Sequence, residues 1–470
     1  MSTEQKIDFG LIGLGVMGRN FVLNVAEKGF SVCGLDRDPQ KVQQLQSERN
    51  ESLPVQATTK LGEFVVGLRE PRKIMLLVPA GAAVDAVLDT LVPLLEPGDC
   101  IADGGNSHFR DTERRITELQ KHGIHFLGVG VSGGASGARK GPSIMPGGAI
   151  EAYMQFRPIF EAAAAKHQGR ACTAYIGPGA SGNYVKMVHN GIEYGLMELI
   201  AETYALLKHV GKLSNQQLSE IFAHWDTGKL RSFLVEITAA IFQRKDPLST
   251  GDLIDSISDQ AQQKGTGKWT SQHAMDLGIP IPTIDAAVSM RGISASKDLR
   301  KELHLSQAKS QINGDSQQLI SDCENALYFG FMISYAQGMH QLTEASQIFG
   351  YQLNHETISR IWSAGCIIRS DMLNLIAQAY AQQINLPHLL LDAQIGAAIL
   401  EHSESARCVS IITLKHGIPA PGLQAAMAYF DAMRTENLHT QLIQAQRDYF
   451  GSHTYQRNDR SGNFHTNWEE

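Results

Sequence analysis

The sequence has little that points to a membrane or to an oxidising compartment. Its six cysteines are scattered and form no CxxC pair, which excludes a zinc ribbon or a redox dithiol and favours a reducing compartment. The start, MSTEQKIDFG, lacks the basic segment and apolar run of a signal peptide. No apolar stretch reaches the roughly 20 residues that a membrane-spanning helix needs. We therefore predict a cytoplasmic protein with no membrane partner.

An excess of positive charge is also missing. Lysine and arginine total 41 against 48 for aspartate and glutamate, which gives a formal net charge of −7. Nucleic-acid binding depends on clustered basic side chains, so we predict no nucleic-acid partner. No cluster with metal-ligand spacing is visible, so we predict no metal site. A hydrophobic content of 43% in 470 residues indicates a globular chain of two or three domains.

A glycine-rich loop follows the first apolar run. Residues 7–12 lead into GLGVMG, which satisfies GxGxxG, and a helical pattern and a second apolar run at 31–36 come next. Strand, glycine turn, helix and strand form a dinucleotide-binding fingerprint, because glycines let the backbone approach a pyrophosphate at a helix N-terminus. A glycine turn without a ligand is the alternative. We assign the loop to a coenzyme through Gly13, Leu14, Gly15, Val16, Met17 and Gly18.

Apolar runs continue to alternate with helical segments up to about residue 180. Residues 73–80, 100–105 and 124–131 read as further strands, which predicts a doubly wound parallel sheet. Ligands of such sheets lie beyond the carboxyl ends of the strands. The glycine-rich segment 131–148 is either an anion-binding loop or a flexible connector. Side chains in the other loops assigned to the coenzyme are Val78, Pro79, Ala80 and Asn106.

The end of the second predicted strand carries two conflicting signals. Asp36 is the acid that usually accepts hydrogen bonds from the adenosine ribose of NAD, whereas Arg37 suits the 2′-phosphate of NADP. Asp38 adds a second carboxylate beside that phosphate, where negative charge is unfavourable. The residues alone leave both coenzymes open.

Long helical patterns dominate from about residue 181 to 440, and they contain an internal repeat. Residues 190–204 (NGIEYGLMELIAETY) align with 325–339 (NALYFGFMISYAQGM), with identities such as Asn190/Asn325. Downstream, residues 221–232 resemble 361–370 with a small change of length. Self-similarity of this kind predicts a duplicated helical unit.

One stripe of the predicted helix around VKMVHNGIEYG (185–195) is unusual. Lys186, His189, Asn190 and Glu193 stand at i, i+3, i+4 and i+7, so they share one helical face. The second copy keeps only the asparagine, since its equivalents are Ser321, Glu324, Asn325 and Tyr328. The alternatives are a solvated charged face and a functional stripe, and the neighbouring glycines 182, 191 and 195 favour the second.

Several motifs together resemble the 6-phosphogluconate dehydrogenase family over nearly the whole chain. They are GLGVMGRN (13–20), DGGNSHFRDT (103–112), VSGGASGARKGPSIMPGG (131–148), KMVHNGIEY (186–194), QKGTGKWT (263–270) and AQRDYFGSHTY (445–455). The resemblance implies an α/β Rossmann-type coenzyme domain at 1–180, a large all-α duplicated domain at 181–440 and a C-terminal tail at 441–470. It also implies a homodimer in which each tail inserts into the partner subunit.

The activity implied by the resemblance is oxidative decarboxylation of 6-phosphogluconate to ribulose 5-phosphate and CO₂ with reduction of NADP. Lys186 resembles the family's general base, which must be neutral, and Glu193 resembles its general acid, which must be protonated. Because a β-keto acid loses CO₂ readily, the reaction needs no metal. The substrate contacts implied by the resemblance are Asn106, Ser132, Gly133, Gly134, His189 and Asn190, with Tyr194, Lys264, Arg291, Arg447 and His453 at the phosphate end.

The chain departs from the family pattern near the adenosine end. Asp36-Arg37-Asp38 stands where the family often has Asn-Arg-Thr, and Pro79 stands where it often has lysine. Family habit and Arg37 favour NADP, with NAD as the alternative. Two other functions remain: a non-decarboxylating β-hydroxyacid dehydrogenase acting on a smaller acid, and a catalytically dead nucleotide-binding protein. The duplication, Glu193 and the tail argue against the first, and the retained Lys186 and Glu193 argue against the second.

Overall fold

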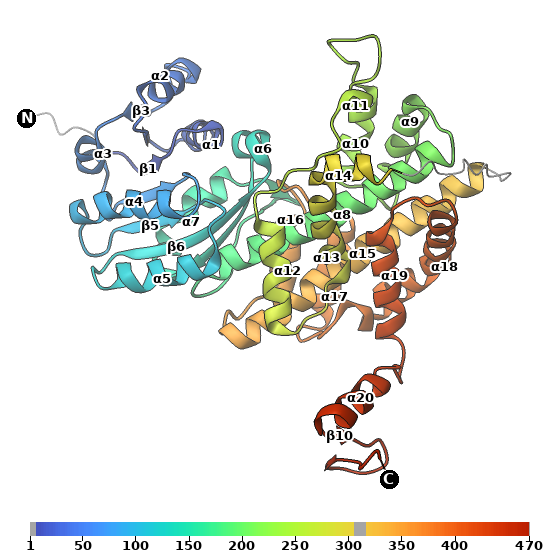
Figure 1. The fold of residues 1–470 in the computed structure, drawn as a ribbon. Helices are drawn as coiled ribbons and strands as arrows, with labels where there is room; N and C mark the ends of the chain where they lie inside the picture. The colour runs from blue at the N-terminus through green and yellow to red at the C-terminus, as the bar shows by residue number, and fades with distance from the viewer. Residues whose placement is uncertain (1–5, 305–315, 470) are drawn as a thin grey trace, which may run out of the picture.

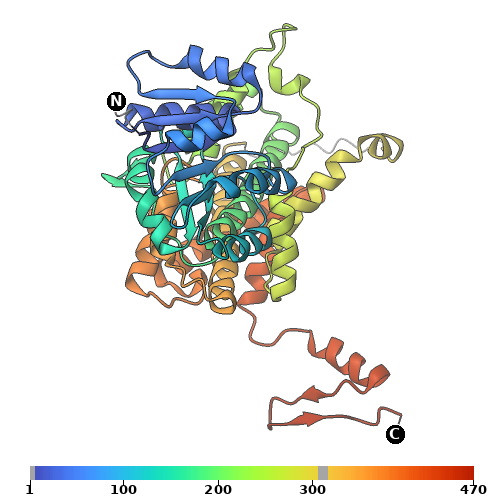
Figure 2. The same cartoon turned by 90° about the vertical axis from the view of Figure 1, so that its left-hand side faces the viewer.

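A computed structural model describes residues 6–304 and 316–469, which form three successive parts (Figure 1). A sheet flanked by helices comes first, and a large helical domain follows. The C-terminal tail projects away from both, as Figures 1 and 2 show from two directions. The predicted fold class is confirmed.

Seven strands form the sheet of the first part, in the order β3-β2-β1-β4-β5-β6-β7. β1 pairs in parallel with β2 on one side and with β4 on the other, so the winding direction reverses beside β1. This reversal places the carboxyl ends of both halves around one crevice, as doubly wound sheets do. The strands are β1 (Phe9–Ile12), β2 (Val32–Leu35), β3 (Val55–Thr58), β4 (Lys73–Leu76), β5 (Cys100–Asp103), β6 (His125–Ser132) and β7 (Ser143–Gly148).

Helices cover both faces of this sheet because side chains alternate along its strands. Phe9 and Leu11 of β1 pack into the layer beneath α1, α2 and α7, whereas Ile12 packs into the layer beneath α3, α4 and α5. The helices are α1 (Val16–Glu27), α2 (Pro39–Glu48), α3 (Leu61–Gly67), α4 (Ala82–Leu91), α5 (Phe109–Gln120), α6 (Gly134–Lys140) and α7 (Ile150–Ala163), with a short 3₁₀ turn η1 (Val92–Leu94).

The sequence expectations for this sheet need four corrections. The sheet is not wholly parallel, because β7 pairs antiparallel with β6. The strand predicted at 73–80 ends at Leu76, and β3 was not predicted because its four residues, VQAT, carry a weak apolar signal. The glycine-rich segment 131–148 is not a flexible connector, since it forms the end of β6, helix α6 and strand β7. Gly133 caps α6 with a φ of 118°, a conformation that suits glycine.

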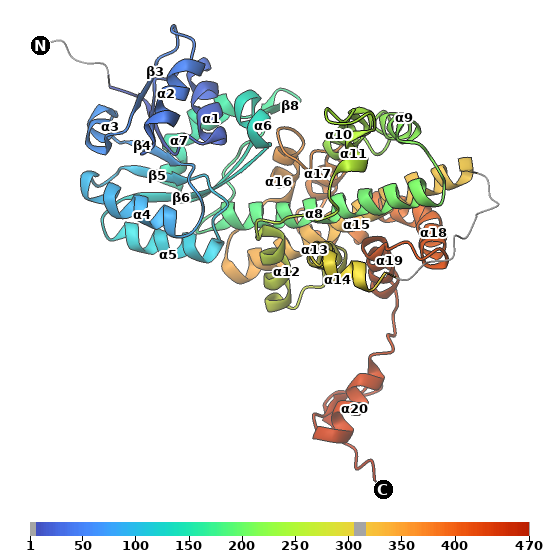
Figure 3. The ribbon, with the colours of Figure 1, turned by 45° about the horizontal axis from the view of Figure 1, so that its top comes forward.

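The 29-residue helix α8 (Ser181–His209) joins the sheet to the helical domain. Its first turn lies directly on β6 and β7, because a Cβ on Gly182 would stand 2.1 Å from the carbonyl oxygen of Gly128. A Cβ on Gly130 would likewise stand 2.5 Å from Cβ of Lys186. Glycine on both sides therefore allows the stripe of α8 that carries Lys186 to approach the sheet closely. Figure 3 shows α8 running from the sheet into the helical domain beside α15 (Ser316–Phe349).

The remaining helices of this domain surround α8 and α15. Apart from those two, the domain contains α9 (Asn215–Trp225), α10 (Phe233–Gln243), α11 (Leu253–Ser256), α12 (Thr266–Leu277), α13 (Pro282–Ala295), α14 (Lys297–Glu302), α16 (His355–Trp362), α17 (Met372–Gln382), α18 (Ala393–Lys415) and α19 (Pro421–Met433). A 3₁₀ turn η2 (Leu389–Leu391) and a hairpin β8 (Lys166–His167) and β9 (Arg170–Ala171) complete the body. None of the helices in the described part of the chain is long and apolar enough to cross a membrane.

The predicted duplication is confirmed by the arrangement of α8–α10 and α15–α17. Each copy is a long helix followed by two shorter ones, and the copies meet where the sequence repeat has Arg-Ser. Ser232 and Ser370 form an antiparallel bridge, in which Phe233 N donates to Arg369 O (3.0 Å) and Asp371 N donates to Arg231 O (3.1 Å). The exchange of one hydrogen bond in each direction gives the two copies a local pseudo-twofold axis.

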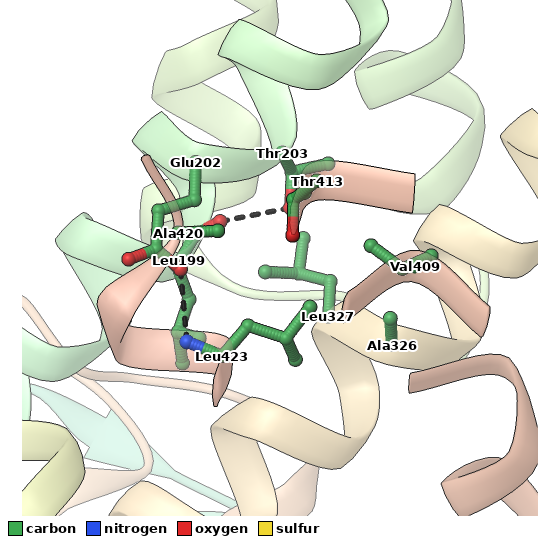
Figure 4. A pocket seen from close by; sticks show the side chains of 9 residues that line it. All are labelled: Leu199, Glu202, Thr203, Ala326, Leu327, Val409, Thr413, Ala420 and Leu423. Atoms are coloured by element: carbon green, nitrogen blue, oxygen red, sulfur yellow. Dashed lines mark hydrogen bonds between the residues drawn. The ribbon is translucent and has the colours of Figure 1, made fainter. Parts of the chain in front are cut away.

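A buried carboxylate ties α8 to the start of α19. Glu202 accepts hydrogen bonds from the backbone N–H groups of Gly422 (2.6 Å) and Leu423 (2.9 Å), which lie in the first turn of α19. It thereby satisfies donors that have no partner within their own helix. Burial raises the pKa of Glu202 to about 8, against the effect of these two hydrogen bonds. Figure 4 shows it beside a small cavity whose other lining residues are Leu199, Thr203, Ala326, Leu327, Val409, Thr413, Ala420 and Leu423.

The C-terminal tail contains α20 (Gln441–Gly451) and a hairpin of β10 (Tyr455–Gln456) and β11 (Asn463–Phe464). Residues 434–440 connect it to α19 and are exposed throughout. In Figure 2 the helix and hairpin lie together at a distance from the body.

Candidate active site

The four polar residues of the α8 stripe lie inside the molecule. Lys186, His189 and Asn190 are buried, and the side chain of Glu193 is 22% exposed. The interpretation as a solvated charged face is therefore wrong. Burial of ionisable groups costs free energy unless they find partners, so their contacts indicate what the stripe does.

His189 stands at the centre of a hydrogen-bond chain. Its Nε2 lies 3.2 Å from Oγ of Ser132, and its Nδ1 lies 3.1 Å from Oδ1 of Asn190. Asn190 in turn donates through Nδ2 to Oγ1 of Thr266 (3.0 Å). Nδ1 also lies 3.3 Å from Nζ of Lys186. With the proton on Nδ1, the imidazole donates to Asn190, accepts from Ser132 and leaves the amine of Lys186 as an acceptor.

The ionisable groups of the stripe are shifted in the directions that acid–base chemistry requires. Burial lowers the pKa of Lys186, although the charge of Glu193 opposes this effect. Burial raises the pKa of Glu193, against the charges of Lys186 and Arg291. Burial and the charge of Lys186 hold the pKa of His189 well below its ordinary value. These directions favour the neutral form of the amine and the protonated form of the carboxyl, which is the combination that a base and an acid on one helical face require.

A second wall of the site comes from α12 and α13. The guanidinium carbon of Arg291 lies 4.9 Å from the ring centroid of Tyr194, which is a cation–π contact. A Cβ on Gly267 would stand 2.5 Å from that ring, so glycine allows α12 to pack against it. The Nε of Arg291 is buried, and no residue in the described part of the chain accepts its hydrogen bond. A free donor on a buried guanidinium suits an anionic ligand. Lys264 is exposed just before α12.

The residues assigned to a coenzyme meet at the carboxyl ends of β1, β4 and β5. The N-cap of α1, Gly15, provides no side-chain hydrogen bond, and a Cβ there would meet no atom within 4 Å. The first N–H groups of α1 are therefore open to a pyrophosphate, which fits a dinucleotide. The other loop residues are Gly13, Leu14, Val16, Met17 and Gly18 after β1, Val78, Pro79 and Ala80 after β4, and Asn106 after β5.

The two carboxylates of Asp36 and Asp38 are both engaged by backbone N–H groups. Asp36 accepts from Leu14 N (2.8 Å) through Oδ2 and from Asp38 N (3.0 Å) through Oδ1. Asp38 caps α2 by accepting from Gln40 N (2.9 Å). Arg37 is exposed between them. Both acids thus have a role in shaping the turn after β2, and Arg37 remains available to a ligand.

The sequence did not single out the loop that closes the site between α16 and α17. Ile367 N donates to Oγ of Ser132 (3.4 Å), and the ring of Trp362 makes an edge contact with His189 at 5.5 Å between centroids. A Cβ on Gly133 would stand 2.5 Å from the carbonyl oxygen of Gly365. The sequence does carry a signal for this loop, because residues 361–370 form one half of the downstream part of the predicted repeat.

The predicted site residues fall into two groups in space. Those of the body converge around α8. Ser132, Gly133 and Gly134 lie at the end of β6 and the start of α6, and Tyr194 lies on α8 beside Arg291 of α13. Arg447 and His453 lie in the projecting tail and do not join them within the same chain (Figure 1). Within residues 6–304 and 316–469, no three His, Cys, Asp or Glu side chains lie together in a way that could hold a metal ion.

The fold and the site define a dinucleotide-dependent oxidoreductase that carries its acid–base groups on the first helix after the coenzyme domain. Family models agree: the NAD binding domain of 6-phosphogluconate dehydrogenase matches residues 8–177, and the 6-phosphogluconate dehydrogenase C-terminal domain matches residues 182–468. The chain belongs to the 6-phosphogluconate dehydrogenase family.

Individual relatives are similar over their whole length. The decarboxylating 6-phosphogluconate dehydrogenase of Lactococcus lactis strain IL1403 is 48% identical over 98% of this chain and 99% of that protein. The NADP(+)-dependent, decarboxylating enzyme of Bacillus subtilis is 47% identical over the same shares. A solved structure of Plasmodium falciparum 6-phosphogluconate dehydrogenase, from a study of its apo form and its complexes with NADP+ and 6-phosphogluconate, superposes with a TM-score of 0.95. It is 44% identical and covers 98% of this chain and 100% of that one.

Proposed function

We propose that the chain oxidises and decarboxylates 6-phosphogluconate, giving ribulose 5-phosphate, CO₂ and reduced NADP. The observation that carries this proposal is the buried stripe of α8, where Lys186 with a lowered pKa and Glu193 with a raised pKa stand two helical turns apart. Two turns correspond to about 10 Å along the axis, a span that a chain-like sugar acid can bridge. The named activity of the full-length relatives is the same.

Oxidation at C3 requires removal of the hydroxyl proton, and Lys186 is the proposed base. Burial lowers the pKa of its amine and so favours the neutral form, and Nδ1 of His189 lies 3.3 Å from Nζ. Bound NADP supplies the hydride acceptor. Gly13, Gly15 and Gly18 would hold its pyrophosphate at the N-terminus of α1, and Arg37 would face its 2′-phosphate. Asn106, in the loop after β5, is a further proposed contact of the nicotinamide or the substrate.

Loss of CO₂ follows because the new C3 carbonyl accepts the electrons of the breaking bond. We assign Ser132, Gly133 and Gly134, at the start of α6, to bind the carboxylate end of the substrate. The enol that remains needs a proton at C1, and Glu193 is the proposed donor. A buried carboxyl with a raised pKa keeps its proton until that step.

The phosphate end of the substrate is assigned to Tyr194, which follows Glu193 on α8, to Lys264 just before α12 and to Arg291 of α13. The buried, unpartnered Nε of Arg291 supports this assignment. We also propose that Arg447 and His453 complete this end from the tail of a partner subunit in a homodimer. The tail carries both residues away from the site of its own chain, and its exposed Leu442, Tyr449 and Phe450 suit an interface.

The test supplies 6-phosphogluconate with NADP or NAD separately and follows reduced coenzyme and CO₂ together. We expect equal amounts of both products with NADP. Reduction without CO₂ would instead support a non-decarboxylating dehydrogenase, and no reduction with either coenzyme would support a dead nucleotide-binding protein. Faster turnover with NAD would overturn the coenzyme assignment alone.

A further inference from the structure

One buried carboxylate accepts hydrogen bonds from separate segments of the C-terminal tail. Asp448 lies in α20, and its side chain is fully shielded from solvent, at 0% exposure. Oδ1 accepts from Thr454 N and His465 Nδ1, each at 2.9 Å. Oδ2 accepts from Thr466 N (3.1 Å) and Trp468 Nε1 (2.9 Å). The donors come from the loop after α20 and from the segment after β11, so this single group joins three separate segments.

The hydrogen bonds of Asp448 saturate a charged carboxylate. An ionised carboxylate offers about four acceptor positions, and all of them are used here. Burial opposes ionisation, but the donors from His465, Trp468 and Thr466 outweigh it and lower the pKa of Asp448 to about 2. Asparagine at this position would have one acceptor oxygen and would turn an N–H₂ group toward two of the donors.

The loop that presents His453 is held on both sides by Asp448. Ser452 N donates to the backbone oxygen of Asp448 (2.9 Å), and Thr454 N donates to its side chain. Ser452 and Thr454 have φ angles of 50° and 59°, in the left-handed region that favours glycine. Residues with side chains keep such a conformation where surrounding contacts fix it. The backbone of the loop that carries His453 is therefore held in part by the carboxylate.

Arg447 is connected to the same loop. Its Nη1 donates to Oε1 of Gln444 (3.1 Å), and Nε2 of Gln444 donates to the carbonyl oxygen of Thr454 (2.6 Å). Arg447 and His453 are thus fixed relative to each other by a frame that needs no contact with the body of the chain.

We propose that Asp448 is a positioning residue that holds the tail in one preformed shape, so that Arg447 and His453 reach the phosphate end of the partner subunit's site together. This inference rests on the proposed function, in which both side chains act across a homodimer. A preformed tail loses less conformational freedom on insertion than a flexible one, which strengthens binding at that end of the substrate.

The first experiment compares Asp448→Asn with Asp459→Asn by steady-state kinetics of the full-length enzyme. Asp459 is the matched control, because it lies in the same tail, pairs with Arg457 and Arg460, and is exposed between β10 and β11. For Asp448→Asn we expect KM for 6-phosphogluconate to rise about tenfold or more, with kcat within about threefold and KM for NADP unchanged. Asp459→Asn should keep all three parent values.

The second experiment separates this role from tail exchange itself. Asp448→Asn and Lys186→Ala chains are co-expressed with different affinity tags, and the mixed dimer is isolated by tandem purification. One of its two sites then combines an intact Lys186 with the intact tail of the Lys186→Ala chain. We expect this dimer to recover the parent KM with half the parent kcat per dimer.

Two different results would overturn the two proposals separately. A parent KM in the Asp448→Asn homodimer would remove the positioning role and leave tail exchange intact. A raised KM that persists in the mixed dimer would contradict tail exchange. If Asp448→Asn fails to form a dimer by light scattering, the milder Trp468→Phe, which removes one donor and keeps an aromatic ring, takes its place. It should raise KM about threefold, and an unchanged KM in that variant would refute the role of Asp448.

Discussion

The side-chain nitrogen of Lys186 lies 3.3 Å from Nδ1 of His189, and both groups are buried on the same face of α8. Two cationic groups at this distance repel each other, and burial adds to this effect by lowering the pKa of both groups. Ser132 donates to Nε2 of the imidazole and Asn190 accepts from Nδ1, so both ring nitrogens of the neutral imidazole have partners. A neutral amine beside this imidazole is the form that the proposed base requires.

Replacement of Lys186 by arginine should abolish oxidation while the coenzyme still binds. A guanidinium stays protonated at all working pH values, so it cannot take the hydroxyl proton. We expect kcat to fall by about 10³ or more, with an unchanged dissociation constant for NADP measured by fluorescence titration. Lys208→Arg, near the end of the same helix, is the control and should retain parent activity. Comparable losses in both variants would mean that the helix, and not the base, was damaged.

The same base predicts the acid side of the pH profile. Lys186 acts when deprotonated, and its pKa is lowered by burial, so kcat/KM should rise with pH and level off below the ordinary lysine value of 10.5. The plot of log kcat/KM against pH measures this midpoint. If log kcat/KM instead keeps rising until the pH reaches the ordinary lysine pKa, Lys186 is not the titrating base.

Replacement of Glu193 by glutamine should separate oxidation from protonation of the enol. Glutamine fills nearly the same volume but has no acidic proton, so hydride transfer persists while product formation slows by about 10². A rapid burst of reduced coenzyme followed by slow release of ribulose 5-phosphate is the expected signature. In deuterated water, deuterium incorporation at C1 should slow in parallel. Loss of coenzyme binding without this separation would contradict the assigned role.

Replacement of Asp36 by asparagine should shift coenzyme preference toward NADP. Asparagine still offers an oxygen to Leu14 N, gives up the bond from Asp38 N, and removes a negative charge near the 2′-phosphate. We expect the ratio of kcat/KM for NADP over NAD to rise about tenfold. Asp38→Asn keeps the N-cap of α2 and should add a smaller increase. A ratio unchanged in both variants would mean that neither carboxylate faces the coenzyme.

Replacement of Glu202 by glutamine should change how stability depends on pH. The pKa of Glu202 rises from 4.5 to about 8 on folding, so between these values the folded chain holds a proton that the unfolded chain releases. This group therefore favours folding below about pH 4.5, and its contribution is lost as pH rises toward 8. Between about pH 5 and pH 8.5, Tm of the parent should fall several degrees further than Tm of Glu202→Gln. Parallel Tm curves would show that Glu202 does not hold this proton.

Much of the coenzyme domain follows from local sequence because each strand is a short apolar run that ends in glycine or a small polar residue. The winding of the sheet and the loop after β1 were predicted in this way. β3 and β7 were not, since β3 has few apolar residues and the glycines around β7 conceal a strand that pairs with β6 across a helix. The contact that demands those glycines, between Gly182 of α8 and the carbonyl of Gly128, joins residues far apart in sequence.

The candidate site divides in a similar way. Spacing on a single helix identified Lys186, His189, Asn190 and Glu193, because helical periodicity is a local property. Thr266 and Ile367 escaped notice, since each contributes one ordinary group whose value depends on packing against α8. The boundaries proposed for the three parts of the chain, its cytoplasmic location and the contribution of the tail to a second subunit stay predictions.

The pseudo-twofold bridge between Ser232 and Ser370 also relates two copies of the repeat that differ at the stripe of α8. The counterparts of Asn190 and Glu193 in the second copy are Asn325 and Tyr328. Helix α18 occupies the space beside them, with Ser405 hydrogen-bonded to Asn325 (3.3 Å) and His402 in edge contact with Tyr328. The second copy thus packs its long helix against its own chain at these positions, and Lys186 and Glu193 of the first copy have no counterparts of their own kind in it.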